Sequence, residues 1–259
     1  MERPGRLEGK VAFITGAGSG IGRAAARRFA QAGAAVAIAE KNAQAGERVA
    51  KEIEGEGGRV LAVETDVTDE RSVERAVAAV VARFGAIHVL FNCAGGSIPQ
   101  DGTVVDVDLS VWDHTMGLDL KGTLLCCRHV IPKIIAAGGG SVVNSSSVVA
   151  LQGQPIHVYS AAKGGVLALT RALAATYARQ NVRVNAICPG IVLSDRIKAR
   201  IEGSGLLDQA RANGFSSESH PFSIGEPIDI ARIALFLASD ESRMIHGATI
   251  PAEGGMSAY

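Results

Sequence analysis

The sequence predicts an α/β fold in which a seven-stranded parallel sheet is doubly wound, with helices on both faces. Three observations indicate this fold. Short apolar runs alternate with longer segments of helical spacing along the whole chain. The apolar runs do not alternate with polar residues, as expected of strands that are buried on both faces. Turns rather than a linker separate the segments, so we expect residues 1–259 to form a single domain.

The expected elements follow from the residues of each segment. Residues 11–15 and 36–39 are short apolar runs, and residues 20–32 between them have helical spacing that ends at Gly33. A valine stripe predicts a helix over 69–84, and glycines at 138–140 end a long helical stretch over 109–135. The other expected strands are 59–63, 87–91, 141–145, 182–187 and 248–251, and the other expected helices are 43–54, 158–179 and 228–237.

Residues 194–226 depart most from this pattern. The segment is polar, contains several glycines and lacks sustained periodicity. In this kind of fold, a long segment that follows the C-terminal end of a strand often covers a ligand. We therefore expect a substrate lid at about residues 194–226.

Composition and charge exclude several classes of function. The chain has 26 Lys and Arg residues against 26 Asp and Glu residues, so it offers no excess positive charge to nucleic acid or to an anionic membrane. No apolar stretch has the length of a membrane span, and none at the start resembles a signal peptide. Four cysteines in apolar settings, without a zinc-binding spacing, favour a reduced cytoplasmic protein that binds no metal: Cys93, Cys126, Cys127 and Cys188.

A glycine-rich turn follows the first expected strand and opens the first expected helix. It reads Thr15-Gly-Ala-Gly-Ser-Gly-Ile-Gly22. Small residues allow the backbone to approach a pyrophosphate, and the helix N-terminus then faces that anion. The spacing departs from G-x-G-x-x-G, because Ile21 stands where the last glycine would be. The position of the turn nevertheless predicts a Rossmann-type, dinucleotide-binding domain.

A carboxylate after the second expected strand bears on the choice of cofactor. Glu40 can accept hydrogen bonds from both ribose hydroxyls of an adenosine, and its charge would repel a 2′-phosphate. This residue favours NAD over NADP. The neighbouring Lys41 keeps NADP open, because a cation there can attract a 2′-phosphate.

A tyrosine and a lysine lie about one helical turn apart at the start of the expected helix over 158–179. Tyr159 and Lys163 therefore share one face of that helix. A free tyrosine, whose pKa is near 10, is a poor base at neutral pH, and a nearby ammonium would lower that pKa. The phenol could then exchange a proton with an alcohol or a carbonyl. Serines at a strand end shortly upstream could orient the reacting oxygen: Ser145, Ser146 and Ser147.

Taken together, these segments resemble the short-chain dehydrogenase/reductase family over residues 10–255. The glycine-rich turn resembles the family's TGxxxGIG cofactor loop, and Tyr159 and Lys163 resemble its YxxxK active-site motif. The resemblance implies the strand order 3-2-1-4-5-6-7, a nicotinamide cofactor and a homotetramer. Three further segments are similar to family motifs, namely Asp66-Val67, Asn92-Cys-Ala-Gly95 and Pro189-Gly190.

The motifs and the resemblance assign residues to the cofactor and to catalysis. The expected cofactor-binding residues are Gly16, Ser19, Gly20, Ile21, Gly22, Glu40, Asp66, Val67, Asn92, Ala94, Gly95, Tyr159, Lys163, Pro189, Gly190, Val192 and Ser194. The expected catalytic residues are Ser147, Tyr159, Lys163 and Asp119.

Two departures from the family pattern concern these catalytic residues. Asp119 stands where the family has an asparagine whose backbone carbonyl holds a water leading to the lysine, and the added charge could alter Lys163. The usual distance to the tyrosine selects Ser146 as the catalytic serine, whereas the local Ser-Ser-Val-Val pattern selects Ser147. We favour Ser147, because a loop absorbs a deletion more readily than a strand end does, and Ser146 stays open.

These features predict an oxidoreductase that transfers a hydride between NAD(H) and a secondary alcohol or ketone. Tyr159 is the expected general acid or base, Lys163 is expected to lower its pKa, and the serine is expected to bind the substrate oxygen. Two alternatives stay open, an NADP-dependent 3-oxoacyl-carrier reductase and a non-catalytic dinucleotide-binding redox sensor. Mostly apolar residues near the expected site favour an uncharged, small-molecule substrate: Gly96, Val148, Val149, Leu151, Ile191 and Val192.

Overall fold

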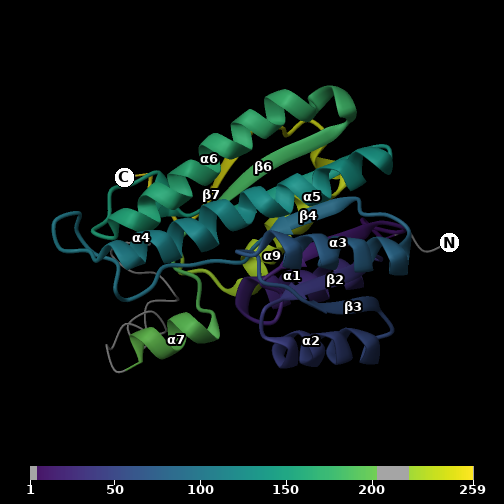
Figure 1. The fold of residues 1–259 in the computed structure, drawn as a ribbon, viewed down its shortest axis with the longest axis horizontal. Coiled ribbons are helices and arrows are strands. Elements are labelled where there is room, and N and C mark those ends of the chain that lie inside the picture. The colour runs from purple at the N-terminus through teal and green to yellow at the C-terminus, as the bar shows by residue number, and fades with distance from the viewer. Residues whose placement is uncertain (1–4, 203–221, 259) are drawn as a thin grey trace.

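The computed structural model describes residues 5–202 and 222–258, so much of the expected lid at 194–226 lies outside the described residues. One parallel sheet of seven strands has the order β3-β2-β1-β4-β5-β6-β7 (Figure 1). This order confirms the doubly wound fold that the sequence predicts. The strands are β1 (Val11–Thr15), β2 (Ala35–Glu40), β3 (Arg59–Glu64), β4 (Val89–Asn92), β5 (Gly140–Ser145), β6 (Val182–Pro189) and β7 (Thr249–Ala252).

Helices cover both faces of the sheet and bury it between two apolar layers (Figure 1). Side chains of β2 alternate between these layers, with Val36 and Ile38 in one and Ala35 and Ala37 in the other. The first layer includes side chains of α1, α2 and α9, and the second includes side chains of α3, α5 and α6. The helices are α1 (Gly20–Gln31), α2 (Ala43–Gly55), α3 (Glu70–Phe84), α4 (Leu109–Thr115), α5 (Gly122–Ala136), α6 (His157–Tyr177), α7 (Asp195–Ile201) and α9 (Pro227–Ala238).

The strand order opens a crevice at the carboxyl ends of the central strands. The chain starts in the middle of the sheet at β1, proceeds outward to β3, and then crosses back to β4 on the other side of β1. The connections that leave β1 and β4 therefore diverge. In open α/β sheets this reversal point is where ligands bind.

The long helix that the sequence predicts over 109–135 is interrupted. A π-helical turn, Met116–Lys121, separates α4 from α5. The apolar periodicity continues across this turn, so the sequence pattern alone could not reveal it. The extra residue per turn changes which side chains face inward, and Asp119 on this turn is completely buried.

Several properties of the described residues bear on the classes of function considered above. Among them, no helix is long and apolar enough to span a bilayer, and no cluster of acidic, histidine or cysteine side chains is arranged to hold a metal ion. All four cysteines are free. Burial raises the pKa of the Cys93 and Cys127 thiols to about 12, so both stay protonated at neutral pH.

Candidate active site

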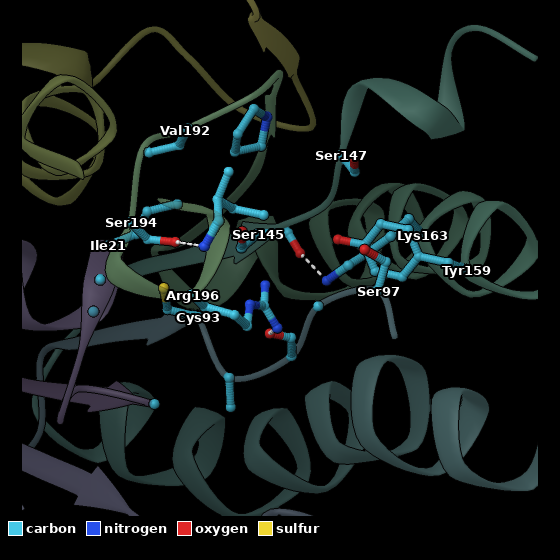
Figure 2. Close-up of a pocket in the computed structure, with 18 of the residues that line it drawn as sticks. Ile21, Cys93, Ser97, Ser145, Ser147, Tyr159, Lys163, Val192, Ser194 and Arg196 are labelled. Atoms are coloured by element: carbon cyan, nitrogen blue, oxygen red, sulfur yellow. Dashed lines mark hydrogen bonds between the residues drawn. The ribbon is translucent and has the colours of Figure 1, made fainter. Parts of the chain in front are cut away.

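A cavity of about 610 Å³ lies at the carboxyl ends of the strands, at the crevice between β1 and β4 (Figure 2). Its lining comes from the turns that follow these strands, from α6 and from α7. The structure brings together in this lining every residue predicted to bind the cofactor, with the exception of Asn92. Ser147 also lines the cavity, whereas Asp119 lies buried behind it.

The glycine-rich turn leaves its backbone open to the cavity because side chains are sterically excluded there. Gly16 has a φ of +64°, and a Cβ on it would lie 2.8 Å from the Cα of Ala94. A Cβ on Gly22 would collide with the carbonyl oxygen of Gly16. The turn can therefore pack this closely against β4 and α1 only with glycine at these positions.

At one end of the cavity, acidic groups are held in fixed positions. The Glu40 carboxylate accepts hydrogen bonds of 3.0 Å from the backbone amides of Gly18 and Asn42. Lys41 Nζ lies 2.7 Å from Asp66 Oδ2 in an ion pair. Partial burial acts to raise the pKa of Asp66, but the hydrogen bonds from Lys41 and Thr68 lower it to about 2. The charge of Lys41 is thus compensated within the protein.

Asn92 does not line the cavity, and its side chain instead connects elements that carry lining residues. Its side-chain amide donates to Asn144 Oδ1 at 2.8 Å, and Asn144 in turn donates to Thr170 Oγ1 at 2.9 Å. These bonds tie β4 to β5 and to α6. Thr15 Oγ1 accepts from the backbone amides of Cys93 and Ala94, both at 3.0 Å, so the turn after β4 is also tied to β1.

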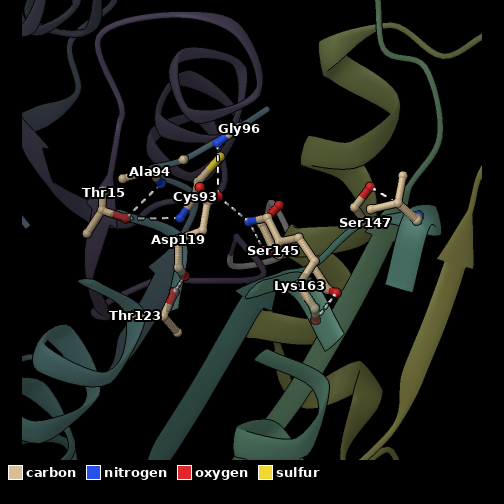
Figure 3. Close-up of polar contacts among 12 residues, drawn as sticks. Thr15, Cys93, Ala94, Gly96, Asp119, Thr123, Ser145, Ser147 and Lys163 are labelled. Atoms are coloured by element: carbon tan, nitrogen blue, oxygen red, sulfur yellow. Dashed lines mark hydrogen bonds and ion pairs between the residues drawn. The ribbon is translucent and has the colours of Figure 1, made fainter. Parts of the chain in front are cut away.

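A buried ion pair lies at the centre of the site (Figure 3). Lys163 Nζ is 2.9 Å from Asp119 Oδ1, and the two side chains are 3% and 0% exposed. Lys163 also donates to the Ser145 carbonyl at 2.8 Å, and the backbone amide of Gly96 donates to Asp119 Oδ1 at 2.9 Å. A Cβ on Gly95 would collide with the Asp119 carboxylate, so this approach depends on glycine.

The Asp119 side chain contacts the lysine directly, in agreement with the expectation that its added charge could alter Lys163. The asparagine of the family is expected to act through its backbone carbonyl. Here that carbonyl accepts a hydrogen bond of 2.8 Å from Thr123 Oγ1, and the carboxylate binds Lys163 instead. The π-helical turn allows this arrangement, because it directs Asp119 toward the start of α6.

The pKa of Tyr159 differs from the expectation drawn from the sequence. Burial raises this pKa above its ordinary value. The Lys163 ammonium opposes that effect, as expected, but the Asp119 carboxylate raises the pKa again. Burial also acts to lower the pKa of Lys163, yet its pKa is raised because Asp119 stabilises the ammonium. The net shift of Tyr159 is therefore upward, and the expected lowering was wrong.

The two candidate serines have different environments. Ser146 Oγ donates to the backbone carbonyl of Lys163 at 2.9 Å, so its hydroxyl is already engaged with α6. The Ser147 hydroxyl is a hydrogen-bond partner of the Tyr159 side chain and lowers its pKa. The geometry therefore favours Ser147 as the serine that faces the reacting oxygen (Figure 2).

Asp101 is a functional residue that sequence reasoning missed. Its Oδ1 accepts from the backbone amide of Val158 at 3.2 Å, and its Oδ2 accepts from that of Tyr159 at 2.8 Å. The N-cap residue of α6, Ile156, makes no side-chain capping hydrogen bond. Asp101 therefore caps the helix that carries the tyrosine. A carboxylate so distant in sequence leaves no local capping signal.

The lining also contains charged residues that the sequence analysis did not select. Arg196 and Arg200 of α7 reach the cavity, and both contact the turn after β4. Leu151, which we expected near the substrate, is 41% exposed and is absent from the cavity lining described here.

Comparisons with known proteins agree with this arrangement. Residues 16–257 match a family model described as enoyl-(acyl carrier protein) reductase. D-threitol dehydrogenase from Mycolicibacterium smegmatis is 38% identical over 251 residues, which cover 96% of this chain and 94% of that protein. A 3-oxoacyl-[acyl-carrier-protein] reductase from Thermotoga maritima is 38% identical over 253 residues, covering 97% of this chain and 99% of that protein.

A solved structure also resembles the whole described fold. It is titled as a short-chain dehydrogenase/reductase from Burkholderia xenovorans. The TM-score is 0.89 at 38% sequence identity, with 98% of this chain and 99% of that chain covered. The likeness therefore extends over both halves of the sheet.

The cap by Asp101 leads to a prediction about stability. We expect Asp101→Ala to lower the free energy of unfolding by about 1–2 kcal/mol, because two backbone amides of α6 lose their acceptor. Asp101→Asn should lose less, since its side-chain oxygen can still accept one bond. Urea unfolding followed by circular dichroism measures both. Asp106→Ala is the control, because the exposed Asp106 bonds only to Thr103 among the described residues. Equal stability of Asp101→Ala and Asp106→Ala would contradict the cap.

Proposed function

The chain belongs to the short-chain dehydrogenase/reductase family, and on that premise we propose that it transfers a hydride between NAD(H) and a secondary alcohol or ketone. One observation carries the proposal. The Tyr159, Lys163 and Ser147 side chains meet in the same cavity as the glycine-rich strand-to-helix turn. A similar chain named as a D-threitol dehydrogenase supports an alcohol substrate. Absorbance of the reduced nicotinamide, recorded with a panel of alcohols and ketones, tests the reaction.

The cavity fits a nicotinamide dinucleotide. The turn over residues 16–22 presents backbone where a Cβ would collide, and Ser19 at the start of α1 makes no side-chain capping bond. These are the features that a pyrophosphate needs for close approach to a helix N-terminus. When bound, the nicotinamide supplies the acceptor or donor of the hydride. The residues proposed to hold the dinucleotide are those of the lining that the sequence analysis assigned to it.

Charges at the adenosine end favour NAD over NADP. Glu40 lies in the lining, and backbone amides hold its carboxylate in place. Lys41 is the one feature of the sequence that favoured a 2′-phosphate. Its ion pair with Asp66 compensates that charge and so weakens the case for NADP.

Proton transfer is assigned to Tyr159. In oxidation the substrate carbon loses a hydride, and its hydroxyl proton passes to the Tyr159 oxygen; in reduction the phenol returns the proton. Lys163 Nζ lies 5.5 Å from the centre of the Tyr159 ring, where its charge favours the phenolate. Ser147 donates a hydrogen bond to the substrate oxygen. Asp119 holds Lys163 in place and offsets part of its charge.

The two alternative functions make different demands on the site. A 3-oxoacyl-carrier reductase needs NADP and an acyl chain delivered by a carrier, and a relative with that name keeps this candidate open. Activity with 3-oxoacyl thioesters but not with simple ketones would favour it. A non-catalytic sensor would bind the dinucleotide and show no turnover across the whole panel.

The chain is also proposed to form a homotetramer, as expected for the family. Apolar side chains are exposed along α4 and α5, with Leu109 77%, Trp112 46% and Leu124 45% exposed. Exposed apolar patches of this kind often mark protein interfaces. We expect light scattering to give the mass of four chains, and Trp112→Glu to lower it. A stable monomer at micromolar concentration would contradict the assembly.

The choice of cofactor is the first prediction about activity. We expect a higher kcat/KM with NAD than with NADP, because Glu40 would repel a 2′-phosphate by about 4 kcal/mol at a separation of about 4 Å, before screening. Glu40→Ala should narrow the difference. Steady-state kinetics with both cofactors measure it. Equal or better efficiency of the wild type with NADP would show that the assignment is wrong.

The second prediction concerns the phenol. Tyr159→Phe removes the exchangeable proton and keeps the ring, so we expect turnover to fall by about 10²- to 10⁴-fold. The affinity for NADH, measured by fluorescence titration, should change little. Tyr177→Phe removes a phenol near the other end of α6 and serves as the control. Near-normal turnover of Tyr159→Phe would assign the proton transfer to another group.

The third prediction concerns pH. Alcohol oxidation needs the phenolate, so its rate should rise with pH through the pKa of Tyr159. Asp119 raises that pKa, and Asp119→Asn should therefore move the midpoint to lower pH. The dependence of kcat/KM on pH at saturating NAD measures the shift. Asp113→Asn, at an exposed position of α4, is the control. An unchanged or higher midpoint in Asp119→Asn would refute the electrostatic coupling.

A further inference from the structure

Two arginines of α7 line the cavity beside the turn after β4. Arg196 lines the cavity together with Tyr159 and Ser97 (Figure 2). Arg200 also belongs to the lining. The two arginines are four positions apart in sequence, so they occupy one face of the helix. Lys198, on the same helix, does not line the cavity. The two arginines of this helix therefore line the cavity, whereas its lysine does not.

Among the described residues, these arginines contact neutral oxygens. Arg200 donates to the hydroxyl and to the carbonyl oxygen of Ser97, both at 3.1 Å, and Arg196 makes one long bond of 3.5 Å to the Gly95 carbonyl. Within residues 5–202 and 222–258, no carboxylate forms an ion pair with either arginine. In the part of the chain that the structure describes, only neutral oxygens bind these two guanidinium groups.

The other cations of the cavity are already paired. Lys163 is bound to Asp119, and Lys41 is bound to Asp66. The lining carboxylates Glu40 and Asp66 lie at the adenosine end, far along the cavity from the serine and tyrosine side. Asp195 is the one carboxylate of α7 in the lining, against two guanidinium groups. Among the described residues, the α7 side of the lining therefore has more cationic than anionic side chains.

Like charges about one turn apart on a short helix destabilise it slightly, and an anion between them reverses that effect. A guanidinium group is suited to a carboxylate, because its planar fork donates two parallel hydrogen bonds to the two oxygens. The positive charge of Arg196 also acts on the phenol, since it lowers the pKa of Tyr159. Arg196 is thus within electrostatic range of the Tyr159 phenol.

We propose that the substrate is a hydroxy acid or oxo acid whose carboxylate is bound by Arg200 and Arg196, while its alcohol or ketone faces Ser147 and Tyr159. This inference rests on the proposed function and narrows its substrate class. It replaces the uncharged substrate that the sequence favoured, because that expectation considered only the apolar residues of the lining. In this arrangement the hydroxyl and the carbonyl oxygen of Ser97 position the Arg200 guanidinium for the carboxylate of the substrate.

The test compares acids with their matched uncharged esters. The wild-type protein is assayed for NADH oxidation with 3-oxobutanoate, 4-oxopentanoate and 5-oxohexanoate, each beside its methyl ester. We expect at least one acid to have a kcat/KM about 10-fold or more above that of its ester. Arg200→Gln should reduce kcat/KM for that acid by about 10- to 100-fold, the loss expected for a charged hydrogen-bonded pair, and should leave the ester nearly unchanged. Arg200→Lys should lose less, and Lys198→Gln should lose nothing.

Other outcomes separate this inference from the proposed function. Turnover of the esters at the same efficiency as the acids would overturn the carboxylate site and leave the dehydrogenase function intact. If Arg196→Gln and Arg200→Gln instead weaken NADH binding by fluorescence titration, without discrimination between acid and ester, the arginines bind the dinucleotide and the inference is wrong.

A binding measurement decides the case in which no ketone is turned over. Isothermal titration of the NADH-loaded protein with each acid should then show binding that Arg200→Gln abolishes and Lys198→Gln retains. Absence of binding by every acid would overturn the inference. Absence of turnover across the wider alcohol and ketone panel would count against the proposed function instead.

Discussion

The buried ion pair between Asp119 and Lys163 is the interaction on which the site depends. Both side chains are almost completely removed from water, so each charge is stable only beside the other. Removal of one partner from such a pair destabilises a protein by about 3–5 kcal/mol, because the other charge stays buried alone. The pair also joins the π-helical turn to α6 and, through the amide of Gly96, to the turn after β4. The ion pair and the Gly96 hydrogen bond therefore hold together three segments near Tyr159, the proposed proton-transfer group.

The same pair modifies the chemistry that it supports. A lysine with no acidic neighbour would act on the phenol with its full charge and lower the pKa of Tyr159. Here burial raises the pKa of Tyr159, and Asp119 raises it again because it offsets part of the lysine charge. The site thus combines a firmly held lysine with a phenol that retains its proton to higher pH. Such a phenol is well suited to donate a proton to a carbonyl and less suited to accept one from an alcohol near neutral pH.

Charge is distributed unevenly along the cavity, and this distribution connects cofactor choice with substrate choice. The adenosine end has fixed carboxylates and a lysine that is already compensated by Asp66. The centre has the neutralised pair of Asp119 and Lys163. The α7 side of the lining has two guanidinium groups. A chain with no net charge can therefore still place acidic and basic side chains in different parts of one cavity.

The sequence by itself determined the fold and the main cofactor turn, because both depend on local patterns. Continuous apolar runs and helical spacing identify strands and helices, and the glycines at 16, 20 and 22 mark the turn between the first of each. Tertiary structure decided the rest. The pairing of Asp119 with Lys163, the cap of α6 by Asp101 and the approach of Arg200 to Ser97 each join residues far apart in the chain. No local pattern encodes such contacts, since they exist only once the sheet has brought the turns after its strands to one edge.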